Sequence, residues 1–212
     1  DCQRHTPQVC TKDPRIRHIK MKRIILVGYM GSGKTTIGRQ LARALGLEFY
    51  DLDWYIESRF HCTVAQIFAE RGEDAFREIE HNMLHEVAEF ENIVLACGGG
   101  TPCFYDNMDY LNAQGESVYL KATPQVLVKH LQMGHVERPL LKGKSEEQMC
   151  AYIEESLQKR EPFYSKAKHI LDVDLLDNHT KIQCSVRLIC NLLGLPYTDN
   201  LNDKKQNTQK LT

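Results

Sequence analysis

The chain has 212 residues, 42% of them hydrophobic, and a formal net charge of −1 at pH 7. This length suits a single domain with one sizeable core. The near-zero charge leaves little general attraction for nucleic acid or an anionic membrane. No apolar run approaches the roughly 20 residues that a membrane span requires. We therefore expect a soluble, cytoplasmic protein with no nucleic-acid or membrane partner.

The eight cysteines raise the alternative of a disulfide framework. None of them forms a C-x-x-C pair, and their spacing fits neither a zinc site nor a thioredoxin-type motif. Several lie inside apolar segments, which favours free, mostly buried thiols in a reducing compartment. They stand at positions 2, 10, 62, 97, 103, 150, 184 and 190.

Apolar runs alternate with amphipathic stretches along the chain, which is typical of βα units around a parallel sheet. In chain order, strands are expected at 23–28, 48–53, 92–97, 117–122 and 169–174. Helices are expected at 34–45, from 53 to about 90, and at 106–114, 124–133, 146–160 and 180–193. The predicted fold is α/β, with a five-stranded parallel sheet flanked by helices in three layers.

One long helical segment carries an apolar stripe. Its members recur at helical spacing and are expected to face the core: Phe76, Ile79, Met83 and Val87. Arg77 lies off this stripe, so a solvated surface arginine is one interpretation of that residue.

Both ends of the chain differ from the predicted domain at 21–195. Residues 1–20 are polar and have no apolar core like that of a secretory signal. Met21 follows them and has the place of a native start. Residues 196–212 are also polar and lack periodicity. We expect both segments to be disordered extensions.

The segment "GYMGSGKTT" follows the first predicted strand and opens the first predicted helix. It matches G-x-x-x-x-G-K-[ST], in which the glycines let backbone N–H groups turn around phosphates. In this pattern Lys34 reaches the β and γ oxygens, and the Thr35 hydroxyl binds Mg²⁺. A glycine-rich turn without a ligand is the alternative. The residues expected to bind the nucleotide are Gly31, Ser32, Gly33, Lys34, Thr35 and Thr36.

Three further segments are expected at the same edge of the sheet. "DLD" (51–53) ends the second strand, "GGGTP" (98–102) follows the third, and "FREIE" (76–80) lies on the helix between them. Ligands of open parallel sheets bind outside the carboxyl ends of the strands. No N/T-K-x-D segment of a guanine-reading GTPase is present, and the third strand lacks the terminal acidic residue of an ATPase motor. Asp53 has the alternative of capping a helix that starts at Trp54.

These residues carry a resemblance. "GYMGSGKTTIGRQLA", "FYDLD", "FREIE", "VLACGGG" and "RPLL" occur in the order and spacing of shikimate kinase, from about Met21 to Leu193. That family has a nucleoside-monophosphate-kinase type of fold. The resemblance implies transfer of the ATP γ-phosphoryl group to the 3-hydroxyl of shikimate, in chorismate and aromatic amino-acid biosynthesis. It also implies ATP as co-substrate and one Mg²⁺ per subunit. We expect a monomer.

The resemblance assigns roles residue by residue. Asp53 matches the aspartate that contacts the shikimate hydroxyls, and Asp51 the one that reaches Mg²⁺ through water. Arg77, oriented by Glu80, and Arg160 match the arginines that bind the shikimate carboxylate. Gly99 matches the glycine whose backbone N–H meets the substrate. An anionic polyol suits paired arginines beside an aspartate.

The resemblance also implies a mobile lid at about 134–145. This segment is bracketed by glycines and carries Arg138, which matches an arginine that reaches the ATP phosphates. With Lys34 and Asp53, it completes the predicted catalytic set. A basic loop that closes over the phosphates excludes water, and an ordinary solvated loop is the alternative. Residues 174–180 offer no clear equivalent of the family's adenine contact, so base recognition stays unassigned.

Two other interpretations stay open. One is a kinase of another small polyol, such as gluconate, or of a nucleotide. The other is a non-catalytic nucleotide-binding module. His81 and His85 have the i, i+4 spacing of metal ligands but lack a zinc protease's glutamate between them, which favours an ordinary surface helix. Cys97 and Cys103 flank the glycines as candidates for oxidation, with no sign of a catalytic role.

We predict that residues 1–20 are dispensable, because they precede the first strand and lack periodicity. A chain that begins at Met21 should keep its melting temperature and its activity. Thermal unfolding and turnover of the two chains, measured side by side, check this. A melting temperature many degrees lower would show that the segment belongs to the fold.

Overall fold

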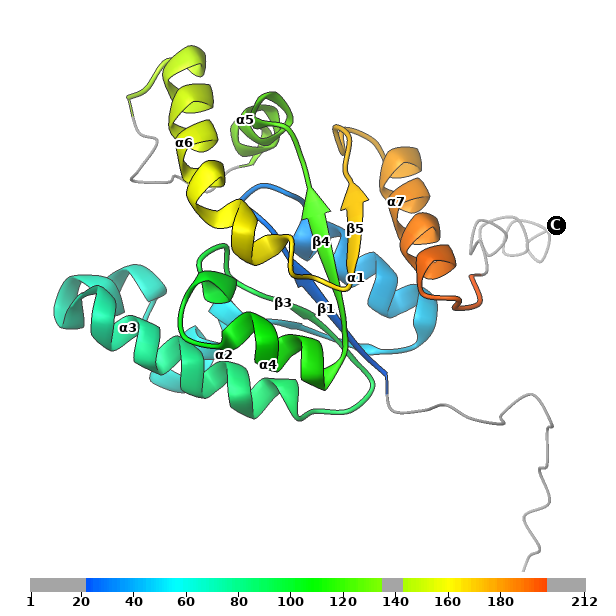
Figure 1. Cartoon of the computed structure of the whole chain (residues 1–212), viewed down its shortest axis with the longest axis horizontal. Helices are drawn as coiled ribbons and strands as arrows, with labels where there is room; N and C mark the ends of the chain where they lie inside the picture. Colours follow the sequence, from blue (N-terminus) through cyan, green and yellow to red (C-terminus); the bar gives the residue numbers. More distant parts are fainter. Residues whose placement is uncertain (1–21, 135–142, 198–212) are drawn as a thin grey trace, which may run out of the picture.

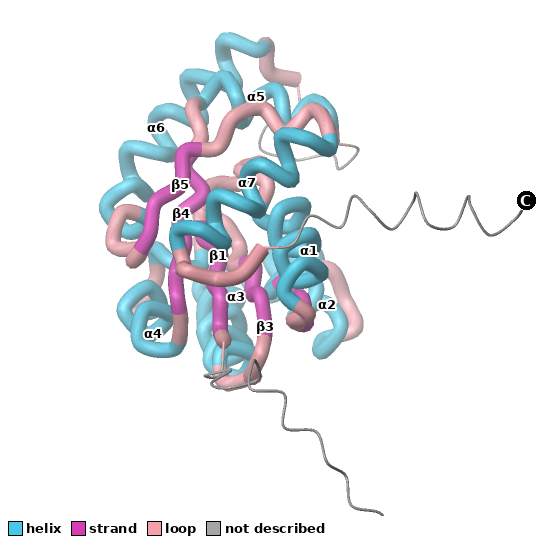
Figure 2. The backbone as a smooth tube through the Cα atoms, turned by 90° about the vertical axis from the view of Figure 1, so that its right-hand side faces the viewer, coloured by secondary structure: helices cyan, strands magenta, loops and turns pink. Residues whose placement is uncertain are grey.

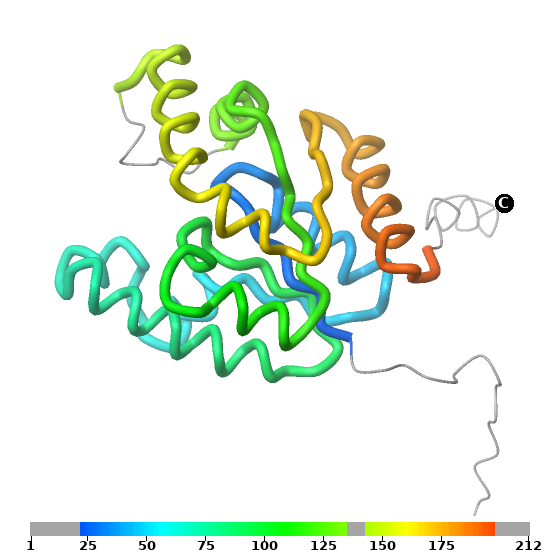
Figure 3. The backbone as a smooth tube through the Cα atoms, in the orientation of Figure 1, coloured from blue at the N-terminus to red at the C-terminus, as the bar shows by residue number. Residues whose placement is uncertain are grey.

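The computed structural model describes residues 22–134 and 143–197. Its five strands form one parallel sheet in the order β2-β3-β1-β4-β5. The strands are β1 Arg23–Val27, β2 Glu48–Asp51, β3 Ile93–Ala96, β4 Glu116–Lys121 and β5 His169–Asp172. Figure 3 follows the chain through these elements. The predicted parallel sheet is confirmed.

Helices cover both faces of this sheet, as Figures 1 and 2 show. They are α1 Lys34–Leu45, α2 Leu52–Phe60, α3 Val64–Ala88, α4 Asn107–Gln114, α5 Pro124–Met133, α6 Glu146–Tyr164 and α7 His179–Leu192, with a 3₁₀ turn, η2, at Thr101–Cys103. Among the described residues no helix is long and apolar enough to cross a membrane.

The central strand β1 explains the three layers. Its residues from Ile24 to Val27 are buried, and successive side chains point to opposite faces of the sheet. Ile25 and Val27 pack in one core with α2, α3, α4, α5 and α6. Ile24 and Leu26 pack in a second core with α1 and α7. A strand buried on both faces has a continuous apolar sequence, as "IILV" at 24–27 does.

The second strand ends two residues earlier than predicted. β2 stops at Asp51, and α2 begins at Leu52. The Asp51 side chain accepts a hydrogen bond from the Asp53 backbone N–H at 3.2 Å, so Asp51 is the helix cap. The interpretation that Asp53 caps a helix from Trp54 is therefore wrong. Asp53 lies in the first turn of α2.

The buried face of α3 also differs from the predicted stripe. Phe76 and Val87 are buried as expected, but Ile79 and Met83 are only half-buried. Glu80 and Leu84 take their places on the buried face, with exposed fractions of 1% and 0%. The helix is therefore rotated by about one residue from the face that apolar periodicity indicates, because a charged side chain is buried there.

Candidate active site

A cleft of about 530 Å³ lies at the carboxyl ends of the strands. The neighbouring strands β2, β3 and β1 bring "DLD", "GGGTP" and the phosphate loop to one edge of the sheet, and α3 carries "FREIE" to the same cleft. The predicted site residues that line the cleft are Gly31, Gly33, Lys34, Thr35, Thr36, Asp51, Asp53, Arg77, Gly99 and Arg160. Ser32 is buried behind them. Arg138 and most of the predicted lid lie outside the described residues.

The phosphate loop has the backbone that its sequence predicts. Gly28 and Gly33 adopt φ angles of 142° and 89°, where side chains are rarely found. Gly33 caps α1, so the positive end of this helix faces the loop. The Lys34 ammonium donates to the carbonyls of Gly28 and Tyr29 at 2.8 and 2.9 Å. The buried Ser32 hydroxyl has no hydrogen-bond partner among the described residues, as expected of a group with a ligand to bind.

A pair of oxygen atoms stands beside the loop. The Thr35 hydroxyl donates to Asp51 Oδ2 at 2.8 Å, while Asp51 Oδ1 holds the start of α2. Hydroxyl and carboxylate oxygens are the ligands that Mg²⁺ prefers. These two residues, from α1 and the end of β2, therefore fit the predicted Mg²⁺ site.

Asp53 is a half-buried carboxylate between the two sides of the cleft. Burial above all, together with the negative charges of Asp51 and Glu80, raises the pKa of Asp53 to about 6, and the positive charge of Lys34 opposes this shift. A carboxyl with this pKa is ionised at neutral pH, and its pKa is close enough to neutral pH for it to take up a proton. The environment thus suits a base that accepts a hydroxyl proton.

Arg77 is a fixed arginine, and its interpretation as a solvated surface residue is wrong. Its side chain is only 11% exposed. It donates to Glu80 Oε2 at 2.6 Å and to Glu73 Oε1 at 3.1 Å. The guanidinium also lies over the Phe104 ring, 4.1 Å from the centroid. Two carboxylates and an aromatic face hold this cation in one geometry at the cleft.

Glu80 has a second partner that the sequence did not indicate. The Thr101 hydroxyl, fully buried in η2, donates to Glu80 Oε1 at 2.5 Å. Both oxygens of this buried carboxylate are therefore paired, as burial of a charge requires. A glutamate on an otherwise apolar helix face was the one signal available for this contact.

The turn after β3 consists of glycines because side chains from other segments come close to its backbone. A Cβ on Gly98 would lie 2.9 Å from Asp53 Oδ1, and one on Gly100 would lie 2.8 Å from an Arg77 nitrogen. The carbonyl of Gly99 accepts hydrogen bonds from Arg160 at 3.2 Å and from the Tyr164 hydroxyl. Each of the three glycines therefore lies close to one residue predicted to bind the substrate: Asp53 at Gly98, Arg160 at Gly99 and Arg77 at Gly100.

Arg160 reaches the turn from a different helix than Arg77 does. It projects from α6, and its guanidinium lies 5.3 Å from the centroid of the Tyr29 ring. α6 continues to Tyr164, beyond its predicted end at 160, and Pro162 lies inside it. This extra turn carries Tyr164, which sequence reasoning missed, to the carbonyl of Gly99.

His130 is a cleft residue that the sequence analysis missed. Its Nδ1 lies 2.7 Å from the Gly31 carbonyl, and the Leu176 backbone N–H donates to its Nε2 at 2.7 Å. A carbonyl only accepts and an N–H only donates, so the ring is the neutral Nδ1–H tautomer. His130 therefore ties the phosphate loop to the segment after β5. A histidine in an amphipathic helix gave no sequence signal for this.

The two cysteines beside the glycines are protonated thiols. Burial raises the pKa of Cys97 far above its usual range and that of Cys103 to about 11. Because the thiolate is the reactive form, neither group is activated at neutral pH.

A phosphate loop facing a pocket of two arginines and a carboxylate defines a P-loop kinase with a small anionic acceptor. The family model for shikimate kinase matches residues 30–188. A shikimate kinase of Phocaeicola vulgatus is 57% identical over 166 residues, covering 78% of this chain and 95% of the relative. The chain belongs to the shikimate kinase family, so the resemblance noted in the sequence is confirmed.

Solved structures agree. A crystal structure of shikimate kinase from Bacteroides thetaiotaomicron has a TM-score of 0.80 at 51% identity, covering 82% of this chain and 99% of that one. The shikimate kinase from Acinetobacter baumannii, in complex with shikimate, has a TM-score of 0.69 at 34% identity, covering 82% and 94%. The predicted fold class is thus confirmed.

Because Glu80 is paired in a buried position and Glu73 in an exposed one, replacing Glu80 should destabilise the protein more than replacing Glu73. Glu80→Gln keeps the shape but removes the buried one of the two carboxylates that pair with Arg77, so the free energy of unfolding should fall by about 1–3 kcal/mol. Glu73→Gln is the matched control, because Glu73 is 59% exposed and pairs with the same arginine; it should change stability by less than about 0.5 kcal/mol. Urea unfolding of both variants checks this. Equal losses would contradict it.

Proposed function

We propose that this chain transfers the γ-phosphoryl group of ATP to the 3-hydroxyl of shikimate, giving shikimate 3-phosphate and ADP. Family membership supports the reaction. The observation that carries it is the meeting of Arg77, Arg160 and Asp53 around one glycine turn, beside the phosphate loop. Two fixed cations next to a carboxylate complement a substrate with one carboxylate and several hydroxyls.

On the donor side, the loop backbone and Lys34 bind the ATP phosphates. Lys34 exchanges its bonds to the carbonyls of Gly28 and Tyr29 for the β and γ oxygens. Thr35 would hold Mg²⁺ directly and Asp51 through water. The bound ion would neutralise charge on the phosphates. We also propose that Arg138, from the lid at 134–145, contacts the phosphates and helps to exclude water.

On the acceptor side, Arg77 and Arg160 bind the substrate carboxylate from α3 and α6. Because the two arginines come from different helices, they fix the orientation of the substrate carboxylate as well as pairing with its charge. The backbone of Gly99 meets the substrate between them. Asp53 then accepts the hydrogen bond of the 3-hydroxyl and directs its oxygen toward the γ-phosphorus.

The chemical step places few demands on the base. The 3-hydroxyl oxygen forms the new P–O bond, the bond between the γ-phosphorus and the β–γ bridging oxygen breaks, and Asp53 takes the hydroxyl proton. The transition state of phosphoryl transfer is loose, so positioning and charge neutralisation supply most of the rate. The fixed geometry of Arg77 and the glycine turn serves that positioning.

One assay separates this function from its rivals. Coupled ADP release should be measured with shikimate, gluconate and nucleoside monophosphates as acceptors. Turnover with shikimate alone supports the proposal. Preference for gluconate or a nucleotide would make the chain another kinase of the same fold, and nucleotide binding without turnover would make it a binding module.

Loss of either carboxylate-binding arginine should weaken shikimate binding. Because a charge-assisted hydrogen bond contributes on the order of 1.5–3 kcal/mol, Arg77→Ala and Arg160→Ala should each raise the KM for shikimate roughly tenfold to hundredfold. The ATP KM should barely change. Arg71→Ala is the control, since Arg71 is exposed and lies on α3 before the kink at Gly72. Steady-state kinetics with each substrate varied checks this. An altered ATP KM with an unaltered shikimate KM would place the arginine on the wrong substrate.

Replacement of Asp53 should slow turnover and spare nucleotide binding. Asp53→Asn keeps the size of the side chain but removes the charge, so kcat should fall by roughly 10²–10⁴, with the lower end favoured by a loose transition state. ADP–Mg²⁺ affinity, measured by calorimetry on the same preparation, should survive because Lys34 and Thr35 are untouched. Near-native turnover would remove the catalytic role of Asp53.

The pH dependence gives an independent check on the same residue. Since the pKa of Asp53 is about 6, kcat/KM for shikimate should fall as pH drops through that value and the base becomes protonated. Asp53→Asn should lose this acid limb.

A further inference from the structure

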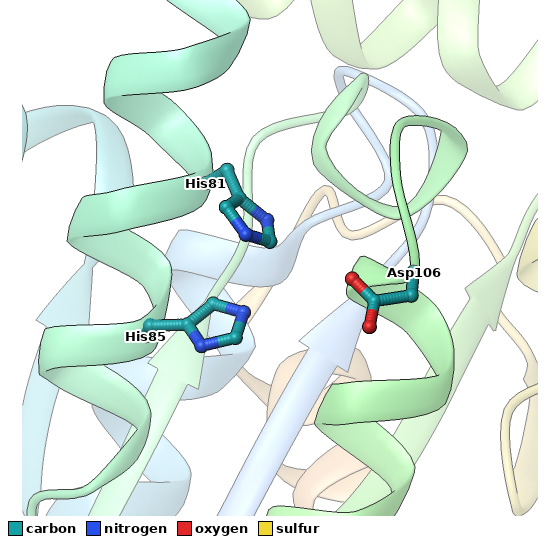
Figure 4. A group of neighbouring side chains, drawn as sticks. All are labelled: His81, His85 and Asp106. Carbon is teal, nitrogen blue, oxygen red and sulfur yellow. The ribbon is translucent and has the colours of Figure 1, made fainter.

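A cluster of three possible metal ligands lies outside the substrate cleft. His81 and His85 stand one turn apart on α3, and the carboxylate of Asp106, just before α4, faces them (Figure 4). One ligand atom from each residue lies within 4.8 Å of the others. None of the three lines the cleft that holds the arginines and the phosphate loop.

The neighbours of His81 determine its tautomer. The amide nitrogen of Asn107 donates to the Thr101 carbonyl at 2.8 Å, which leaves the amide oxygen of Asn107 as an acceptor. His81 Nδ1 lies 2.6 Å from that oxygen and therefore carries the proton. In the neutral ring, Nε2 then has the lone pair. A histidine that donates one N–H to a buried oxygen while its other nitrogen is available has the arrangement of a metal ligand.

His85 has a buried nitrogen without a partner. Its Nε2 makes no hydrogen bond among the described residues and is shielded from solvent. The ring is stacked on Tyr110, with centroids 3.6 Å apart and planes 12° apart. Stacking fixes the ring but does not satisfy the nitrogen. Buried polar atoms in native proteins are almost always paired, with protein, water or an ion.

We propose that His81, His85 and Asp106 bind a divalent transition-metal ion of the zinc class. Two imidazoles and one carboxylate are a common zinc ligand set, with water at the fourth position. Ligand atoms in such a site lie about 3.3 Å apart, given bonds of about 2.0–2.1 Å. Asp106 is exposed, so its side chain is free to rotate toward the two rings and shorten its own distances to them.

The bound ion would link two elements of the acceptor site. Helix α3 carries Arg77 as well as the two histidines, and Asp106 begins the helix whose Asn107 holds the η2 turn. Metal binding would therefore cross-link α3 to the segment that follows the glycine turn. A gain in thermal stability on metal addition is the expected physical consequence.

Zinc titration of the full, chelator-treated chain tests this. Calorimetry and dialysis with metal analysis, without Mg²⁺, should show that the wild type binds one Zn²⁺ more than Asp106→Asn or His85→Gln does, or binds it at least tenfold more tightly. Removal of even an outer partner of a ligand lowers metal affinity about 10–100-fold. The control His179→Gln removes an exposed histidine and should bind like the wild type. Zinc should raise the melting temperature of the wild type and control but not of Asp106→Asn.

Two results would overturn the proposal. One is equal zinc stoichiometry and affinity in the wild type and Asp106→Asn, which would assign any binding to other residues. The other is no zinc binding by the wild type, which would make the cluster an aromatic packing contact with Tyr110. Asp106 is exposed, so its variant tests the site even if His85→Gln does not fold.

Discussion

Glu80 is a carboxylate buried at 1% exposure on the core-facing side of α3. A charge in that place is tolerated only when its partners are close and well aligned. Arg77 on its own helix and Thr101 in η2 supply them, one to each oxygen. The pairing holds Arg77 at the cleft and anchors the turn after β3 to α3. It also places a negative charge near Asp53, which contributes to the raised pKa of that residue. The acceptor side of the site therefore depends on this one buried ion pair.

The glycine turn is shaped by the same need to bring charged side chains close to the substrate. Asp53 and Arg77 approach the backbone so closely that a Cβ at Gly98 or Gly100 would touch them. Several charged groups must surround a small substrate within a few ångströms. A backbone without side chains leaves room for the substrate and for those charged groups. Flexible glycines lose more entropy on folding than other residues. The hydrogen bonds of Arg160 and Tyr164 to the Gly99 carbonyl help to offset that loss.

The donor side is held differently, by backbone and by histidine. The phosphate loop takes its shape from positive-φ glycines and from α1, all within a few residues of sequence. His130, far along the chain, holds the Gly31 carbonyl and the backbone at Leu176. The loop that binds phosphate is thus fastened to the segment after β5. A change in the position of the segment after β5 is therefore expected to shift the phosphate loop.

The sequence by itself determined the five strands, most helix boundaries and the phosphate loop, and the family resemblance supplied the residues predicted to bind the substrate. The strands, helices and phosphate loop follow from local periodicity and local motifs, and parallel strands present their carboxyl ends at one edge of the sheet. The tertiary structure decided which polar groups pair. It made Asp51 the cap of α2, buried Glu80 in an apolar stripe, brought His130 to the phosphate loop and placed Asp106 against His81 and His85. Each of these outcomes depends on a partner from another segment or on a rotation of one residue. The alternation of polar and apolar side chains indicates which face is buried. It carries no information about which buried donor finds which acceptor, because those partners meet only when the sheet is assembled.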